Sequence, residues 1–418
     1  MTVGQAGMKH PSLAGMVEAI QLRMTREGLH ARFTQRAVAF LETCLKHLLQ
    51  QKITRTSPLQ ASFLNFFKRV LIFDSSSWDV DPALASVLPG SGGGASTANC
   101  KLQTAYEYKH GELGFFKIDP GTRPDNAYTA HLPSHLQRGD LALFDQGYFK
   151  LETLLEIVRR GAFFLTRFLL STTLQDAETS DRIDLETRLH GLPGDTHEFQ
   201  VVMGGKKGKS KVKCRLICLR VSEQVANERR RRIHKQAKKK GRTPSKTHLA
   251  LCDWTLLVTN VPETELPVKM AWPLYMLRWQ IELLFKQLKS VLSLHKSDTE
   301  NHDRLKCEIY GKLICAVLVH RIHGRINNQL WNQTGRELSF DKFHKRIQER
   351  AFILLRLLLK SVHEAVLYLT AAIKRFAKNC LKLCQRSRQT TLEILKMLEG
   401  AEEPRIISIE KVLAECLN

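Results

Sequence analysis

The sequence predicts a mixed α/β fold with helical regions at both ends, and three observations lead to this prediction. Short apolar runs that end in an acid alternate with other elements between residues 69 and 160, as in a sheet with buried strands. Residues 11–53 and the chain after residue 275 show helical spacing of apolar side chains with few breakers. A chain of 418 residues can also bury one large core or two to three smaller ones.

The N-terminal region, residues 1–65, is predicted to be a small basic helical domain. Apolar side chains recur at helical spacing from Met16 to Leu48. The region holds 8 Lys or Arg and 3 Asp or Glu, a balance of +5. We therefore expect a separate, positively charged module at this end of the chain.

Two apolar runs after this module each end in an aspartate. Arg69–Asp74 and Asp140–Asp145 read as buried strands, and each brings a carboxylate to a strand end. Lys101–Tyr108 and Gly114–Ile118 read as a pair of strands between them. Leu151–Arg160 is expected to be helical, with a further strand after it.

A cationic run interrupts the short strands that follow. Residues 206–246 hold 17 Lys or Arg and 2 Asp or Glu, which is +15 of the chain's +23. A solvated arm is one interpretation, but like charges this dense repel each other unless a polyanion neutralises them. Phosphate binding is therefore the favoured interpretation, and nuclear localisation is a weaker one. The continuous blocks within the run are Arg229, Arg230, Arg231, Arg232, Lys238, Lys239 and Lys240.

The overall charge predicts a polyanionic partner, with nucleic acid first and an anionic membrane surface second. The sequence contains no run of about 18 apolar residues, so no membrane span is predicted. The first residues lack the basic-then-apolar layout of a signal peptide. Ten cysteines occur without paired metal-ligand spacing, so reduced buried thiols are favoured over a zinc site. A cytoplasmic protein is the expectation.

One segment combines an acid, two cations and a phenol. On a single α-helix, Tyr275, Arg278, Glu282 and Lys289 would share a stripe about 60° wide, beside an apolar flank. We therefore expect a helix that packs one flank into a core. Its neighbouring flank would present groups suited to metal and phosphate chemistry.

The three acids, Asp74, Asp145 and Glu282, suggest a metal centre. Strand ends in an open sheet converge on one crevice, and a helix packed across the sheet could add the third acid. Converging carboxylates repel each other unless cations bind, and Mg²⁺ is the hard cation that suits them. Two such ions can promote phosphodiester displacement. Taken singly, each aspartate is more often a turn or helix cap, and Glu282 could pair with a neighbouring cation on its helix.

These residues resemble a known family. Tyr275-x2-Arg278-x3-Glu282-x6-Lys289 is similar to the YREK signature of insertion-sequence transposases of the "insertion sequence four" type, in the DDE superfamily. Phe73-Asp74-Ser-Ser and Phe144-Asp145-Gln-Gly-Tyr resemble the motifs of the first and second acids, and Asp253–Asn260 resembles the strand before the signature. The similarity covers roughly residues 65 to 325. Gln146 departs from the family, which often carries a basic residue there.

The resemblance implies a ribonuclease-H-like mixed-sheet core interrupted by a mainly β insertion, between helical flanks. It implies that the three acids hold two Mg²⁺ ions, with Mn²⁺ as a substitute. It also implies that Arg278 and Lys289 bind phosphates, that Tyr275 hydrogen-bonds a phosphate, and that Trp254 stacks on a flipped base. Without the resemblance, Trp254 would be read as a core residue of a strand. Five regions are expected. Residues 1–65 would bind the DNA end, residues 66–180 would form the first part of the core, and residues 181–262 would be a β-rich insertion with the basic arm. Residues 263–325 would form the second part of the core, and residues 326–418 would be C-terminal helices for dimerisation.

The predicted function is that of a DNA transposase. It would bind the terminal inverted repeats of its element as a homodimer, cleave the 3′ ends and join them to target DNA, with a hairpin intermediate implied by the resemblance alone. A metal-dependent nuclease without strand transfer is one alternative. A non-catalytic DNA-binding relative is another, and a membrane-surface protein is a remote third.

Overall fold

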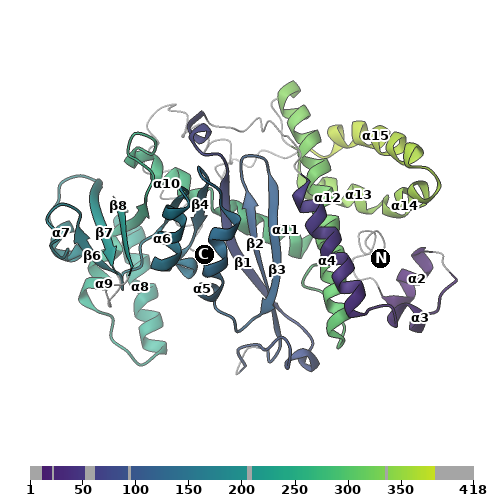
Figure 1. Cartoon of the computed structure of the whole chain (residues 1–418), viewed down its shortest axis with the longest axis horizontal. Helices are drawn as coiled ribbons and strands as arrows, with labels where there is room; N and C mark the ends of the chain where they lie inside the picture. The colour runs from purple at the N-terminus through teal and green to yellow at the C-terminus, as the bar shows by residue number, and fades with distance from the viewer. Residues whose placement is uncertain are drawn as a thin grey trace. The chain divides into compact units, whose positions relative to one another are not determined.

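The computed structural model shown in Figure 1 describes the following residues: 12–20, 23–51, 62–92, 96–204, 210–334 and 338–381. They form two compact units, each assembled from segments that are far apart in the sequence. The helical unit comprises the described residues of 1–58, 74–123 and 280–385. The sheet unit comprises the described residues of 59–73 and 124–279.

The strands of the sheet unit lie in the order β1-β4-β5-β9-β8-β7-β6, and only residues 70–73 of β1 belong to this unit. The beginning of β1 pairs in parallel with β4, from Val70↔Leu141 to Ile72↔Leu143, and β5 continues in parallel on the other side of β4. The pairs from β5–β9 to β7–β6 are antiparallel. The bounds are β1 (Val70–Asp79), β4 (Leu141–Phe144), β5 (Phe163–Arg167), β6 (Thr173–Asp176), β7 (Thr196–Gly204), β8 (Lys211–Arg220) and β9 (Trp254–Thr259).

The parallel part of this sheet follows from its sequence. All four residues of β4 are apolar and buried, as expected for a strand covered on both faces. A parallel pair needs a crossover, and α6 (Leu151–Arg159) supplies it between β4 and β5 while burying Leu154 and Ile157. The prediction for residues 151–160 is therefore confirmed.

The sheet unit also contains further helices and short helical turns. The longest described one, α8 (Glu223–Lys239), begins at Ser222, whose hydroxyl accepts a hydrogen bond from the Val225 N–H. Much of the cationic run is thus helical, although no helix was predicted there. The other helices and turns are η1 (Ser62–Phe66), α5 (Asp125–Tyr128), η3 (Thr129–His135), η4 (Gln146–Tyr148), α7 (Leu185–Leu189), α9 (Lys246–Ala250), η5 (Leu251–Asp253) and α10 (Val268–Met276).

The helical unit combines a β-hairpin with long helices. Strands β2 (Asn99–Glu107) and β3 (Glu112–Pro120) pair antiparallel, and Gly111 at their turn has a φ of +66°. Such a backbone conformation strains residues that carry a Cβ. In Figure 1 helices α4 and α12 run side by side. The elements are α2 (Leu13–Ile20), α3 (Arg26–His30), α4 (Gln35–Gln50), η2 (Pro82–Leu84), α11 (Trp279–Ser290), α12 (His302–Thr334), α13 (Phe340–Gln348), α14 (Ala351–Lys360) and α15 (Val362–Asn379).

The predicted mixed α/β architecture with flanking helices is confirmed, and two local predictions need correction. Strand β1 does not end at Asp74 but continues to Asp79, and a hydrogen bond from the Val80 N–H to the Ala98 carbonyl follows it. The predicted continuous helix across the signature is broken into α10 and α11. Pro273 lies inside α10, and Arg278 bonds back to the Tyr275 carbonyl, three residues earlier, so the chain tightens into a turn.

Parts of the predicted terminal regions, residues 1–11, 21–22, 52–61 and 382–418, lie outside the described residues. The described cysteines are free thiols, and all but Cys44 are buried. Burial raises the pKa of Cys100 and Cys218 to about 12, so these thiols stay protonated. In the part of the chain that the structure describes, no helix is both long and apolar enough to cross a bilayer.

Candidate functional site

Asp145 follows β4 directly and is held by the turn that comes next. Its carboxylate accepts a hydrogen bond from the Gly147 N–H at 2.9 Å, which caps the short helix η4. A Cβ at Gly147 would lie 3.0 Å from the carboxylate oxygen Oδ1 of Asp145, and 3.6 Å from a carboxylate oxygen of Asp125. Glycine therefore lets the backbone approach the acid closely. The turn fixes the direction in which Asp145 points.

The residues beside Asp145 tie it to strand β5. The Gln146 amide donates a hydrogen bond to the Phe168 carbonyl at 2.6 Å, and the Thr166 hydroxyl lies 3.5 Å from the Asp145 carbonyl. Gln146 is the position where the sequence departs from the transposase pattern. In this chain it joins the end of β4 to the end of β5 through a neutral amide.

Tyr275 is a buried residue of the sheet unit, near the end of α10. Its side chain is 5% exposed, and burial raises the pKa of its phenol to about 12. The Arg278 and Arg167 charges oppose this rise, the Asp145 charge adds to it, and the Arg278 side chain forms a hydrogen bond with the phenol. The charges of Arg278 and Asp145 therefore both act on the Tyr275 phenol, although α10 ends between Tyr275 and Arg278.

Arg167 was missed by the sequence analysis. It ends β5, and its charge acts on both Tyr275 and Arg229. No hydrogen bond or ion pair of its side chain is present among the residues that the structure describes, and the side chain is partly buried. Its place at the end of a strand next to β4 was the available signal, because neighbouring parallel strand ends meet at one edge.

Asp74, Glu282 and Lys289 belong to the helical unit. Asp74 is partly buried within β1, and its carboxylate accepts a hydrogen bond from the Ser75 N–H at 2.8 Å. Glu282 lies in the first turn of α11 and Lys289 in its last turn, the ends at which the helix dipole favours an acid and a base respectively. Ile281, Leu284 and other apolar side chains of α11 are buried, as predicted for the flank beside the polar stripe.

Lys289 is held by β1. Its ammonium donates a hydrogen bond to the Ser77 carbonyl at 2.9 Å and lies 5.9 Å from the centre of the Trp78 ring. Partial burial lowers the pKa of Lys289 below its usual range. The contact places the signature lysine beside the strand that carries Asp74.

The structure thus divides the predicted acids between the units, with Asp145 in the sheet unit and the other two in the helical unit. Within the described ranges, no three His, Cys, Asp or Glu side chains lie close enough to hold a metal ion. The donor chemistry nevertheless suits a hard divalent cation, because all three predicted ligands are carboxylates.

Trp254 begins β9 and is 7% exposed. The Arg220 guanidinium carbon lies 4.6 Å from the centre of its ring, and His197 meets the ring edge-on with centroids 5.5 Å apart. In this arrangement the indole is part of the packing between β7, β8 and β9.

The basic blocks divide into cations that fasten α8 and cations that face solvent. Arg229 donates to the Trp254 carbonyl and the Thr255 hydroxyl, each at 2.9 Å, and burial lowers the pKa of its guanidinium to about 10. Arg230 forms an ion pair with Asp253 at 2.6 Å. Arg232 is partly buried. The exposed cations of the helix and its end are Arg231, Lys235, Lys238, Lys239 and Lys240.

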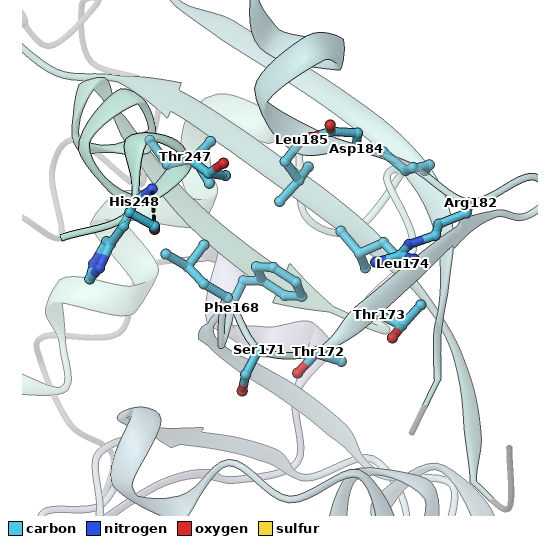
Figure 2. Close-up of a pocket in the computed structure, with 14 residues that line it drawn as sticks. Phe168, Ser171, Thr172, Thr173, Leu174, Arg182, Asp184, Leu185, Thr247 and His248 are labelled. Carbon is cyan, nitrogen blue, oxygen red and sulfur yellow. Dashed lines mark hydrogen bonds between the residues drawn. The ribbon is translucent and has the colours of Figure 1, made fainter. Parts of the chain in front are cut away.

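A separate cavity of about 560 Å³ lies in the sheet unit, between the start of β6, the segment before α7, and α9. Figure 2 shows Phe168 and Leu185 on its apolar side, and Thr172 and Arg182 at its rim. None of the predicted site residues lines it. The cavity is therefore distinct from the groups around Asp145.

The sequence of the chain is similar to those of known proteins. Residues 65–318 match the family described as "Transposase DDE domain". The chain is 31% identical over 388 residues to the transposase for insertion sequence element IS231E of Bacillus thuringiensis subsp. finitimus, covering 89% of this chain and 81% of that protein. It is 27% identical over 406 residues to the transposase for IS1151 of Clostridium perfringens, covering 90% and 83%. A shorter match, 32% over 145 residues, is to the putative transposase InsL for IS186A of Escherichia coli K12, covering 34% and 39%.

Proposed function

We propose a function for this chain from the premise that it belongs to the DDE transposase family of insertion sequences. In this proposal it binds the terminal inverted repeats of its own element and moves that element by cutting and joining DNA. The family membership carries DNA transposition as the general function and a ribonuclease-H-like fold for the core. The proposal adds the steps: hydrolysis at each 3′ end, then attack of the freed 3′ hydroxyl on target DNA. Because the relatives are bacterial, the expected place of action is the nucleoid.

The observation that supports the proposal is the set of charged groups, Asp145 among them, that act on the buried Tyr275 phenol. A carboxylate that follows a buried strand is common, but the charge of this one acts on the buried Tyr275 phenol, as do the charges of Arg278 and Arg167. Such a group of donors fits a phosphate: Arg by a planar fork and Tyr by its hydroxyl. Lys289 would add a point charge near Asp74.

Asp74, Asp145 and Glu282 are the proposed ligands of two divalent ions, with Mg²⁺ as the working ion and Mn²⁺ as a substitute. The parallel register of β1 and β4 supports this assignment, because each aspartate follows the pair Ile72↔Leu143 by two residues on its own strand. When bound, the ions would activate the attacking oxygen and stabilise the leaving one. The protein's own part is to orient the DNA end by the phenol and the cations.

Further contacts complete the proposal. The basic residues of α8 would neutralise DNA phosphates, mainly through the exposed side chains. Trp254 would stack on a flipped base after releasing Arg220, and the N-terminal region would recognise the ends. The helical hairpin α14–α15 exposes Leu359, Val362 and Leu367, which supports a role in a homodimer.

A strand-transfer assay tests the function. Purified protein is incubated with Mg²⁺, a labelled duplex that carries the element's end, and a target plasmid. We expect nicks at the 3′ end followed by joined products, both abolished by EDTA. Nicks without joined products would identify a nuclease, and end binding without nicks would identify a non-catalytic relative.

Variants then test the ligands. Asp74→Asn, Asp145→Asn and Glu282→Gln should each abolish nicking and joining while leaving end binding within about twofold, because they keep shape and remove charge. Asp181→Asn, at an exposed aspartate between β6 and α7, is the matched control. Normal nicking by any of the three site variants would remove that acid from the proposed ligand set.

A further inference from the structure

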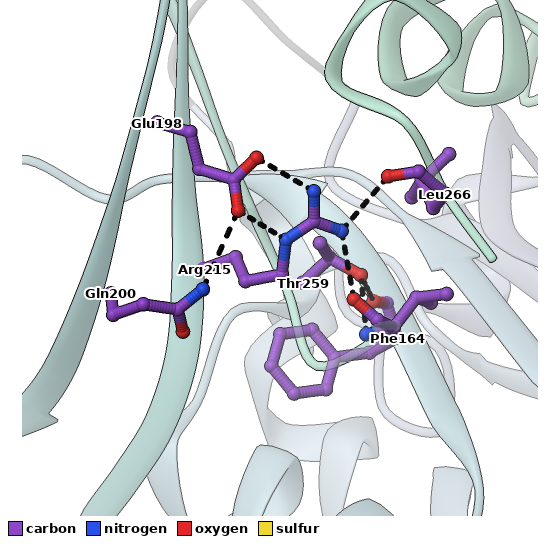
Figure 3. Close-up of polar contacts among 7 residues, drawn as sticks. Phe164, Glu198, Gln200, Arg215, Thr259 and Leu266 are labelled. Atoms are coloured by element: carbon purple, nitrogen blue, oxygen red, sulfur yellow. Dashed lines mark hydrogen bonds and ion pairs between the residues drawn. The ribbon is translucent and has the colours of Figure 1, made fainter. Parts of the chain in front are cut away.

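The connection between β9 and α10 is held by a buried arginine from β8. The Arg215 guanidinium donates through Nη1 to the Val261 carbonyl at 2.8 Å and to the Leu266 carbonyl at 2.9 Å, as Figure 3 shows for Leu266. The whole residue is 4% exposed. One side chain therefore bridges both ends of the segment that leads from the sheet to the signature region.

Glu198 on β7 compensates the charge of this arginine. Its carboxylate accepts from Arg215 Nε at 2.5 Å and from Nη2 at 2.7 Å, in the two-pronged geometry that favours Arg over Lys. Figure 3 also shows the Gln200 amide directed at the same carboxylate. The guanidinium thus has one side on an acid and the other on two backbone carbonyls.

The connection needs such a donor because it buries its own backbone. Val261 and Leu266 are fully buried, and a buried carbonyl without a donor costs free energy. The first helical residue of α10 follows Pro267, which has no N–H and gives no side-chain cap. The start of α10 therefore relies on contacts from outside the helix.

The two ends of the connection are anchored to different strands. At the β9 end, Asn260 accepts from the Phe164 N–H at 2.8 Å and donates to the Ala162 carbonyl at 2.9 Å, which ties it to β5. At the α10 end, the Leu266 carbonyl is tied to β8 by Arg215. Strand β8 belongs to the predicted insertion, so the insertion reaches the helix that carries Tyr275.

We propose that Arg215, compensated by Glu198, is a positioning residue that fixes the start of α10 and so holds Tyr275 and Arg278 beside Asp145. The inference rests on the proposed function only for the roles of Tyr275 and Arg278. It gives the insertion a mechanical part in cleavage, in addition to any DNA contact of its own.

The sharpest variant replaces the whole pair, Glu198→Met with Arg215→Met. Removing both partners leaves no uncompensated buried charge, whereas removing one would. The two carbonyls lose their donor while the volume of the pair is kept. Arg188→Met is the matched control, because the Arg188 guanidinium lies over the Phe199 ring of β7 and, among the described residues, forms no hydrogen bond with the connection.

Hydrogen exchange measures the structural claim without any activity. Amides of residues 261–276 should exchange at least about tenfold faster in the pair variant than in the native protein or in Arg188→Met, while amides of β7 and β8 stay protected. Unchanged exchange across 261–276 would overturn the proposal, whatever the outcome of the transposition assays.

End nicking measures the functional claim. The pair variant should nick roughly 10- to 100-fold more slowly, with end binding reduced far less, because misplacing a positioning group affects the reaction more than the affinity. In a Tyr275→Phe background the same replacement should cost at least about threefold less, since the group that it positions is already gone. An undiminished cost would overturn the link to Tyr275.

Two outcomes keep the proposals separate. If the native protein does not nick element ends, the proposed function fails. The hydrogen-exchange result alone then decides whether Arg215 fixes the start of α10. If the double variant does not fold, Arg215→Lys replaces it, because an ammonium keeps the charge but cannot hold Glu198 and both carbonyls together. Native exchange and native nicking in Arg215→Lys would overturn the proposal.

Discussion

The Asp145 carboxylate accepts the N–H of Gly147, two residues later, at 2.9 Å. The contact closes a turn that is tight for a side chain at position 147, because an added Cβ would lie 3.0 Å from the same carboxylate oxygen, which would have to move. Asp145 is thus oriented by the absence of a neighbouring side chain as well as by a hydrogen bond.

Gly147→Ala should therefore displace the Asp145 carboxylate and slow end nicking by roughly 10- to 100-fold. The expected loss of stability is small, on the order of 1 kcal/mol, because the position is exposed. Nicking rates and thermal unfolding measure the two effects. Gly204→Ala at the end of β7, where a Cβ meets nothing within 4 Å, is the control. Equal nicking by both variants would contradict the expectation.

Tyr275→Phe should change the alkaline stability of the protein. The phenol has a folded pKa of about 12, against about 10 in an unfolded chain, so its contribution is complete below pH 10 and is lost as the pH rises to 12. The native protein should lose roughly 2–3 kcal/mol over this interval that the variant keeps. Urea unfolding at pH 9, 10.5 and 11.5 measures the difference. A parallel decline in native protein and variant would show that the phenol ionises freely.

The exposed cations of α8 should set part of the salt dependence of DNA binding. Replacing Arg231, Lys235, Lys238 and Lys239 by Gln removes up to four phosphate contacts. The slope of log K against log salt should then fall by up to about 4. Arg229→Gln is the contrasting variant: it should lower thermal stability and leave the slope nearly unchanged, because this guanidinium is bonded inside the protein. Binding measured from 50 to 300 mM salt decides, and an unchanged slope in the fourfold variant would show that α8 does not touch DNA.

His344→Phe should make the helical unit less sensitive to acid. The imidazole is 1% exposed, neither ring nitrogen has a partner in the described ranges, and burial lowers its pKa to about 4. Its contribution to stability is complete above the unfolded pKa of about 6.5 and is lost as the pH falls towards 4, by roughly 3 kcal/mol. Unfolding curves at pH 7.5 and 4.5 should differ less for the variant than for native protein. His363→Phe, at an exposed position of α15, should behave like native protein.

The strands were predicted well from the sequence because a buried strand appears there as a short run of apolar residues. Asp145 at the end of β4 was found in this way. The break between α10 and α11 was not, because four polar residues at helical spacing look the same on one helix or on two.

The roles of individual cations were harder to predict for a different reason. Composition records that Arg229 is charged, but not that the carbonyl of Trp254 and the hydroxyl of Thr255 lie within its reach. Arg215 carried no signal either, because two of its partners are backbone carbonyls more than forty residues away, and its acid partner Glu198 lies on the neighbouring strand. Contacts of this kind depend on strand pairing, which the sequence does not state.

The fastening of α8 by Arg229 and Arg230 has a consequence for comparing such chains. Two sequences with the same number of basic residues in this stretch need not be equivalent proteins. Exchanging every arginine of the run for lysine would preserve its formal charge and its appearance as a polyanion-binding segment. It would also remove the forked donors that hold the helix to η5 and β9. A tally of charge is therefore only an upper limit on how many phosphates this segment can meet.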